Sequence, residues 1–205
     1  MIRWGLIGGS DIAATRMIPA LRALGQSPVA VSSSSAERAE LFAGRHEIAH
    51  ACRDVDELLA RDDIDAVYIS SLNRLHAEHT IAAAAAGKHV LCEKPVALDV
   101  ADAAAMVAAC DRAAVVFAVN HHLPAHTSNT VIRQLVADGA VGEVRSIRAF
   151  FAYELAPRLR GWRLTDPAVG GPILDLVPHV ASVVNKIAGT PSSAPACCGP
   201  TRSAP

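Results

Sequence analysis

Short apolar runs alternate with longer, alanine-rich segments of helical period over roughly the first 120 residues of the chain. The apolar runs predict five strands, at residues 3–7, 29–32, 66–70, 89–92 and 115–119. Each run is apolar enough to be buried on both faces, as strands of parallel sheets are. Strands that alternate with helical segments are typical of successive βαβ units. The pattern therefore predicts an α/β protein with a doubly wound parallel sheet covered by helices.

The clearest helical pattern lies at residues 100–112. Apolar side chains recur there every three or four residues from Val100 to Cys110, and Asp99 is a residue type favoured at helix N-caps. We therefore predict a helix that begins after Asp99.

After Asn120 the pattern changes, and we expect an incomplete α+β domain at residues 121–189. Its predicted elements are a helix at 127–138, strands at 144–153 and 162–164, and a helix opened by Gly170-Gly171-Pro172. Residues 190–205 are rich in Pro, Ser, Ala and Cys, and a disordered tail is predicted there. The expected division of the chain is therefore 1–120, 121–189 and 190–205.

Charge and hydropathy exclude several partners. The chain has 19 Lys and Arg against 20 Asp and Glu, so no nucleic-acid partner is expected, because phosphate contacts need clustered Lys and Arg. The longest apolar run, residues 103–110, is far shorter than the roughly 20 residues that span a bilayer, so no membrane span is expected. The N-terminus lacks a signal pattern and the five cysteines lack paired CxxC spacing. A cytoplasmic protein with reduced thiols is predicted.

A glycine turn follows the first predicted strand. Gly8, Gly9, Ser10, Asp11 and Ile12, with the alanine after them, match the fingerprint G-x-G-x-x-G/A except at Ser10. Glycines there let the backbone approach a pyrophosphate, and the N-terminus of the next helix offers free N–H groups. A tight strand-to-helix turn without a ligand also favours glycine, so both interpretations stay open.

The second predicted strand ends in a serine run that bears on the choice of cofactor. A site for NAD usually has an acidic residue about 20 positions after the glycines, but no acid occurs between Asp11 and Glu37. Ser33 and Arg38 instead offer a polar donor and a cation that could hold a 2′-phosphate. We therefore predict NADP(H) as the preferred cofactor, with NAD(H) possible; the alternative is that Arg38 is a solvated helix residue.

The most specific motif is His89-Val90-Leu91-Cys92-Glu93-Lys94-Pro95, preceded by Gly87-Lys88 and by Asn73-x-x-His76. With the glycine turn, Asn120 and the Gly170-Gly171 helix that carries Asp175 and His179, it resembles the glucose-fructose oxidoreductase and inositol 2-dehydrogenase family (Gfo/Idh/MocA) from about residue 2 to residue 189. The resemblance implies a Rossmann-type dinucleotide-binding domain at residues 1–120. It also implies a cis Lys94–Pro95 bond and cofactor contacts from Asn73, His76, Glu93, Lys94 and Asn120.

The candidate catalytic residues are Lys94, Asp175 and His179. Oxidation of an alcohol needs a base for the hydroxyl proton and a cation near the developing alkoxide, and Lys94 suits the second task. Asp175 and His179 are four apart and share one face of a helix. By resemblance, His179 is the general acid/base and Asp175 positions the substrate or the proton relay. Pro178 directly before His179 is expected to kink that helix.

Other histidines invite a metal interpretation, which we do not favour. His121, His122 and His126 cluster after Asn120, and two more lie at His76 and His79. No Cys or carboxylate accompanies either group in a recognised ligand pattern, so no metal is predicted.

The function indicated is an NAD(P)-dependent oxidoreductase that transfers a hydride between nicotinamide and a sugar, cyclic polyol or related diol. The alternative is a catalytically impaired dinucleotide-binding remnant or interaction module, because family members carry a larger second domain than this chain supplies. The resemblance thus predicts a chain shortened at its C-terminus, able to form a homo-oligomer only if that domain were complete.

Overall fold

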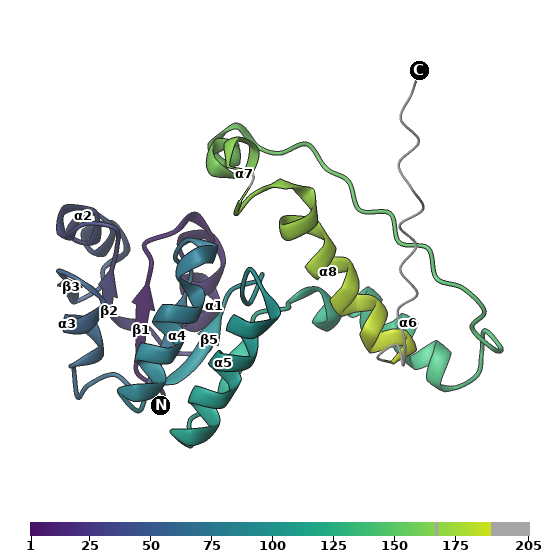
Figure 1. Ribbon diagram of the computed structural model, residues 1–205, viewed down its shortest axis with the longest axis horizontal. Helices are drawn as coiled ribbons and strands as arrows, with labels where there is room; N and C mark the ends of the chain where they lie inside the picture. Colours follow the sequence, from purple (N-terminus) through teal and green to yellow (C-terminus); the bar gives the residue numbers. More distant parts are fainter. Residues whose placement is uncertain (167, 190–205) are drawn as a thin grey trace. The chain divides into compact units, whose positions relative to one another are not determined.

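The computed structural model describes residues 1–166 and 168–189, and it contains a six-stranded parallel sheet of order β3-β2-β1-β4-β5-β6 (Figure 1). The strands are β1 (Trp4–Ile7), β2 (Pro28–Ser32), β3 (His50–Cys52), β4 (Ala66–Ile69), β5 (His89–Cys92) and β6 (Phe117–Val119). The five predicted strands are confirmed. The structure contains one further strand, β3, which was not predicted because it is only three residues long. The predicted tail at residues 190–205 lies outside the described residues.

Helices cover both faces of this sheet, as the doubly wound pattern predicts. One apolar layer joins β1, β2 and β4 to α1 (Ile18–Ala23) and α2 (Ala36–His46). The layer on the opposite face receives α3 (Val55–Leu59), α4 (His76–Ala85) and α5 (Val100–Arg112). Each helix therefore buries one apolar face against the sheet, which holds the strand ends in place.

Two short helical segments complete this part of the chain. A π-helical turn, η1 (Ala13–Met17), precedes α1, and the N–H of Ile18 donates to the carbonyl of Ala13 five residues earlier. Pro19 follows at once and has no N–H for the α-helical pattern, which fits a π-turn at this point. A 3₁₀ turn, η2 (Asn73–Leu75), leads directly into α4.

The carboxyl ends of the strands are aligned by backbone hydrogen bonds that continue one residue past each strand. Gly8 N donates to Ser32 O, Ser70 N to Ile7 O, Glu93 N to Ile69 O and Asn120 N to Cys92 O, at 2.7–2.9 Å. The residues that follow β1, β4, β5 and β6 therefore form one row along this edge. Open parallel sheets bind their ligands at this edge.

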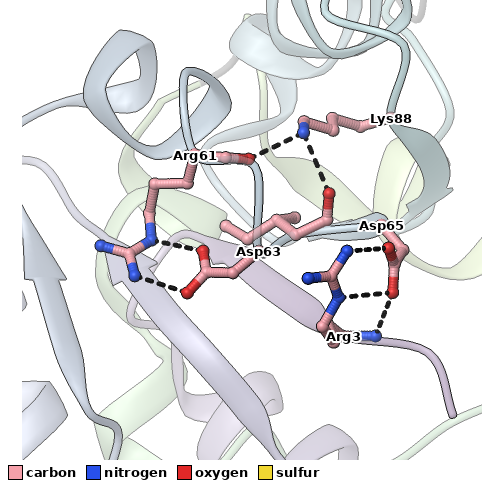
Figure 2. A network of polar contacts seen from close by, with 6 residues as sticks. Arg3, Arg61, Asp63, Asp65 and Lys88 are labelled. Atoms are coloured by element: carbon pink, nitrogen blue, oxygen red, sulfur yellow. Dashed lines mark hydrogen bonds and ion pairs between the residues drawn. The ribbon is translucent and has the colours of Figure 1, made fainter.

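The opposite edge of the sheet is tied by a polar network, shown in Figure 2. The Arg3 guanidinium, just before β1, donates to both oxygens of Asp65, just before β4, at 2.6 and 3.0 Å. These bonds hold the pKa of the Asp65 carboxyl well below its usual range. Lys88, before β5, donates to the carbonyls of Arg61 and Ile64 at 2.8 and 2.9 Å. The starts of three neighbouring strands are thus fixed together.

The described residues divide into two compact units, one within residues 1–121 and 155–175, the other within residues 122–154 and 176–189. Beyond β6 the helical elements are η3 (Leu123–Ala125), α6 (Thr127–Ala137), η4 (Pro157–Leu159), α7 (Gly161–Thr165) and α8 (Gly171–Ala188). The helices predicted at 127–138 and after Gly170 are confirmed. Helix α8 continues on both sides of Pro178.

Two strand predictions in this region are wrong. Residues 144–153 form no strand, and residues 162–164 lie inside helix α7. A strand needs a neighbour to accept its backbone hydrogen bonds, and all strands in the described part of the chain belong to the sheet of the first unit. An apolar run alone is therefore insufficient. Among the residues that the structure describes, no helix is long and apolar enough to cross a membrane.

Candidate active site

The turn after β1 is shaped by Gly8. Its φ is +111°, and a Cβ added there would lie 2.8 Å from the backbone of Ser70. A side chain at this position would therefore collide with the end of β4 and adopt a strained conformation. The glycine turn is thus required by close contact with the neighbouring strand as well as being suited to a phosphate.

Ser10 takes part in this turn through its hydroxyl. Ser10 Oγ accepts a hydrogen bond from Ala13 N at 3.1 Å, which is the N-cap pattern, and it lies 2.7 Å from Ser70 Oγ. Ser70 Oγ in turn donates to Gly8 O at 3.1 Å. The serine that departs from the glycine fingerprint therefore starts the helix and ties the turn to β4. Asp11 and Ile12 form the first residues of the helical segment.

Ser33 lies in the loop that follows β2, and Arg38 lies in the next helix, α2. Ser35 caps α2 by accepting a hydrogen bond from Arg38 N at 3.3 Å, and Arg38 is exposed in the first turn. Within residues 1–166 and 168–189 the guanidinium of Arg38 forms no ion pair. A cation that is exposed and lacks an ion-pair partner at a helix N-terminus is available to an anionic ligand.

Asn73 and His76 follow β4 at the carboxyl edge of the sheet, and both are buried. Asn73 Nδ2 donates to Val169 O at 3.1 Å, and the two ring nitrogens of His76 lie 2.8 Å from Pro95 O and 3.2 Å from Ser71 O. Burial lowers the pKa of His76, so the ring is neutral at pH 7 and donates to one carbonyl at a time. His76 therefore fixes the Lys94–Pro95 loop, whose peptide bond is cis as the resemblance implies.

Glu93 follows β5 directly and carries a buried carboxylate. Its Oε1 accepts hydrogen bonds from the Tyr68 hydroxyl at 2.6 Å and from Asn120 Nδ2 at 2.7 Å, and its Oε2 accepts from Lys94 N at 3.3 Å. Buried carboxylates need such donors to offset the loss of water. The structure thus brings together Glu93, Lys94 and Asn120 from two adjacent strand ends.

Lys94 forms the central ion pair of the site. Its Nζ donates to Asp175 Oδ1 at 2.7 Å and to Asp175 O at 2.8 Å, and the two side chains are 12% and 17% exposed. A second cation is close to the same carboxylate, with Arg163 Nε 3.7 Å from Asp175 Oδ2. Arg163 also lies over the ring of Trp162, 4.4 Å from its centroid. The Asp175 carboxylate therefore lies near two cations and is largely shielded from solvent.

His179 lies one helical turn after Asp175 on α8, as the spacing predicts. It belongs to the second compact unit, where it is buried against the rings of His122 and Phe151 at centroid distances of 5.2 and 5.9 Å. No group of three metal-ligating side chains occurs in the part of the chain that the structure describes.

Three residues with evident roles at this site were not found from the sequence. Tyr68 and Ser70 lie at the end of β4, and Arg163 lies in α7. Both Tyr68 and Ser70 lie inside the predicted strand at residues 66–70, so the pattern carries no signal of a further role for either. Arg163 and Asp175 lie on two successive helices, α7 and α8, and no local periodicity reports that these two side chains meet.

The strand order, the glycine turn after β1 and the polar residues along the carboxyl edge define a Rossmann-type dinucleotide-binding protein. Within that class the chain belongs to the Gfo/Idh/MocA family. Residues 2–121 match the model of the oxidoreductase family with an NAD-binding Rossmann fold. Residues 129–204 match the GFO/IDH/MocA C-terminal domain.

Named relatives and solved structures agree with this assignment. The chain is 46% identical over 185 residues to a 1,5-anhydro-D-fructose reductase of Ensifer adhaerens, covering 90% of this chain and 56% of the relative. It is 43% identical over 109 residues to a scyllo-inositol 2-dehydrogenase (NADP(+)) of Bacillus subtilis, covering 53% and 33%. The crystal structure of KijD10, a 3-ketoreductase from Actinomadura kijaniata in complex with NADP and TDP-benzene, superposes with a TM-score of 0.82 at 33% identity, covering 92% and 57%. The chain thus spans about half the length of these relatives or less.

Proposed function

We propose that the chain is an oxidoreductase that uses NADP(H) and acts on a sugar, cyclic polyol or related diol. The observation that carries this proposal is the Lys94–Asp175 ion pair, which lies beside the buried carboxylate of Glu93 at the carboxyl edge of the sheet. Relatives named as a sugar reductase and as an NADP(+)-dependent inositol dehydrogenase support the same reaction class.

The cofactor site in this proposal follows the carboxyl edge. Gly8, Gly9, Ser10, Asp11 and Ile12 would hold the pyrophosphate through backbone N–H groups at the start of the first helical segment. The turn suits this task, because its glycine brings backbone rather than side chain to the edge. The remaining contacts would come from residues after the other strands: Ser33, Arg38, Asn73, His76, Glu93, Lys94 and Asn120.

NADP(H) is favoured over NAD(H) by the end of β2. Arg38 is a cation without an ion-pair partner in the described ranges, and no acidic residue occurs between Asp11 and Glu37, where a site for NAD usually has one for the two ribose hydroxyls. A 2′-phosphate would meet this cation and the hydroxyl of Ser33. The KijD10 structure, solved with NADP, has the same fold.

The chemistry needs three tasks from the chain's own residues. When bound, the nicotinamide supplies or accepts the hydride. Lys94 would place its ammonium against the substrate oxygen and stabilise negative charge there. Asp175 orients that ammonium through two hydrogen bonds, and His179 would give or take the hydroxyl proton.

The two parts of the chain would divide this work. We assign residues 1–120 to the cofactor-binding domain and residues 121–189 to a partial substrate domain, whose described residues form helices but none of the strands expected of an α+β domain. The substrate would be a small sugar or polyol, and neither nucleic acid nor membrane enters the proposal. Association into a homo-oligomer would depend on a complete second domain.

The test is a titration of the purified chain with NADPH and with NADH, followed by nicotinamide fluorescence. We expect tighter binding of NADPH, and the Arg38→Ala variant should weaken NADPH binding about 10- to 100-fold, the range for a lost charge-assisted contact. Binding of NADH should change little, because NADH has no 2′-phosphate.

A matched control is Arg45→Ala, which removes an exposed arginine from the last turn of the same helix. It should bind both dinucleotides as the wild type does. If the wild-type chain binds neither dinucleotide, the proposed function is wrong. If Arg38→Ala weakens both equally, the cofactor preference is wrong.

A further inference from the structure

The carboxylate of Glu93 is held by donors from two neighbouring strands, and one of these donors is outside the residues proposed above for cofactor and catalysis. The Tyr68 hydroxyl donates to Glu93 Oε1 at 2.6 Å, in the range of short, charge-assisted O–H···O⁻ bonds. Asn120 Nδ2 donates to the same oxygen at 2.7 Å. Oε2 receives only a longer bond, 3.3 Å from Lys94 N, from the described residues.

The register of the sheet makes the Tyr68 contact a fixed feature. Tyr68 of β4 is paired with Leu91 of β5, and Leu91 is paired with Ala118 of β6. Side chains alternate along a strand, so Glu93, two residues after Leu91, lies on the same face as Tyr68. Asn120, two residues after Ala118, joins them there. Each of the three neighbouring strands, or the residue just after it, thus contributes one polar side chain, and the three side chains meet at Glu93 Oε1.

The hydroxyl of Tyr68 is not required for packing. The ring is 0% exposed and lies in the apolar layer with Leu6, Val31 and Ile18, where phenylalanine would fill the same space. Burial and the neighbouring carboxylate raise the pKa of Tyr68, so the hydroxyl keeps its proton and always donates. The group is therefore a permanent donor aimed at Glu93.

We propose that Tyr68 is a positioning residue for the nicotinamide half of the cofactor, acting through Glu93. The inference rests on the proposed function. A dinucleotide lies across the crevice where the strand order reverses, between β1 and β4, with the 2′-substituent of the adenosine over the end of β2. The nicotinamide riboside then lies over the ends of β4 and β5, beside Glu93.

The two oxygens of Glu93 have different tasks in this arrangement. Oε1 is occupied by two strong donors, so Oε2 is the oxygen that accepts a hydroxyl of the nicotinamide ribose. The terminal torsion of a glutamate side chain is broad and has no sharp preference of its own. Tyr68 and Asn120 together fix that torsion before the cofactor arrives, which lowers the entropy cost of binding.

The experiment compares two ligands on the Tyr68→Phe variant. NADPH, which carries the nicotinamide half, should bind about tenfold more weakly than to the wild type. Adenosine 2′,5′-bisphosphate, which carries only the adenosine half, should bind with an unchanged Kd by calorimetry. A merely structural role would weaken both ligands in parallel, and that result would overturn the inference. The control is Tyr153→Phe, the same chemical change at an exposed tyrosine.

A double-mutant cycle tests whether Tyr68 acts through Glu93. The Glu93→Gln variant should also weaken NADPH selectively, and adding Tyr68→Phe to it should cause no further loss. An additive further loss would overturn the route through Glu93. Wild-type affinity of Tyr68→Phe for NADPH would overturn the inference while leaving the proposed function in place. Failure of the wild type to bind NADPH would overturn both.

A spectroscopic measurement covers the case in which Tyr68→Phe does not fold. The chain has two tyrosines, so a Tyr153→Phe chain labelled with 3-fluorotyrosine reports on Tyr68 alone. Saturating NADPH should shift its fluorine resonance, and adenosine 2′,5′-bisphosphate should not. An unmoved resonance in the presence of saturating NADPH would overturn the inference.

Discussion

The Lys94–Asp175 pair illustrates which features of single residues the sequence reveals and which it conceals. Each residue was picked out separately, Lys94 by the Glu-Lys-Pro motif and Asp175 by its spacing from His179. Their contact joins residues 81 positions apart. Local periodicity carries no information on such a contact, and the same holds for Arg163 on the other side of the carboxylate. The sequence thus supplied the chemistry of the site, and the fold supplied its pairing.

Replacement of Lys94 by alanine should lower kcat about 10²- to 10³-fold, the range for loss of one group that stabilises a developing oxyanion. The substitution removes the ammonium and leaves Asp175 with Arg163 as its cation partner in the first unit. The measurement is steady-state consumption of NADPH with a sugar that the wild type reduces. Lys186→Ala, at an exposed position in the last turn of α8, is the control and should keep wild-type turnover. Unchanged kcat in Lys94→Ala would contradict the assigned role.

Among the secondary-structure elements, those specified by local signals were predicted well. Helix α5 begins where its cap predicts, because Asp99 Oδ1 accepts a hydrogen bond from Asp102 N at 2.8 Å. The predicted strand at residues 144–153 was wrong, because a strand depends on a partner that no local pattern supplies. Strand β3 was missed for the converse reason: its three residues are too few to form a pattern, yet β2 lies beside it to accept its backbone bonds.

The cap of α5 can be tested by Asp99→Ala. Loss of the side-chain acceptor leaves an N–H group of the first turn without its bond and should lower the free energy of unfolding by about 1 kcal/mol. Asp99→Asn keeps an acceptor at the same place and should remain close to the wild type. Urea unfolding followed by circular dichroism measures the difference. Equal loss in both variants would show that charge, rather than the cap, stabilises the helix.

For the whole molecule, the parallel sheet covered by helices and the family could be predicted, while the order of its six strands and the arrangement of the second unit could not. Parallel strands in βαβ units follow rules of handedness and short connection, so five apolar runs already restrict the topology strongly. Residues 122–154 contain one α-helix and a long segment without regular structure. In that region the sequence does not show which other element the apolar residues would pack against, and that contact decides between helix and strand.

Stability of the whole fold should depend on pH through two histidines of α4, the buried His76 and the half-buried His79. Burial lowers the pKa of His76 and of His79 below the usual value. Below about pH 6.5 the unfolded chain therefore binds protons at these histidines that the folded chain does not bind. The free energy of unfolding has its full value above that pH and falls as the pH drops toward the folded-state pKa. Each group contributes at most about 1.4 kcal/mol per pH unit.

Urea unfolding at neutral pH and at mildly acidic pH measures this loss. The His76→Gln variant should lose less stability on acidification than the wild type, because it lacks one of the two groups. His50→Gln, at an exposed position, serves as the control and should follow the wild type. A wild-type curve that is flat between the two pH values would refute the assignment.

The central position of β1 has a consequence for how the protein is made. Of the six strands of this sheet, β1 leaves the ribosome before the others, yet it pairs with β2 on one side and with β4 on the other. After β2 is complete, the second edge of β1 stays open until β4 ends 37 residues later. Synthesis of that stretch takes about 2 to 7 s at ~5–20 residues per second. The ion pair between Arg3 and Asp65 can form only when the chain has been synthesised as far as the start of β4. During that interval the nascent chain presents an apolar, unpaired strand edge, which is the kind of surface that chaperones shield in the cell.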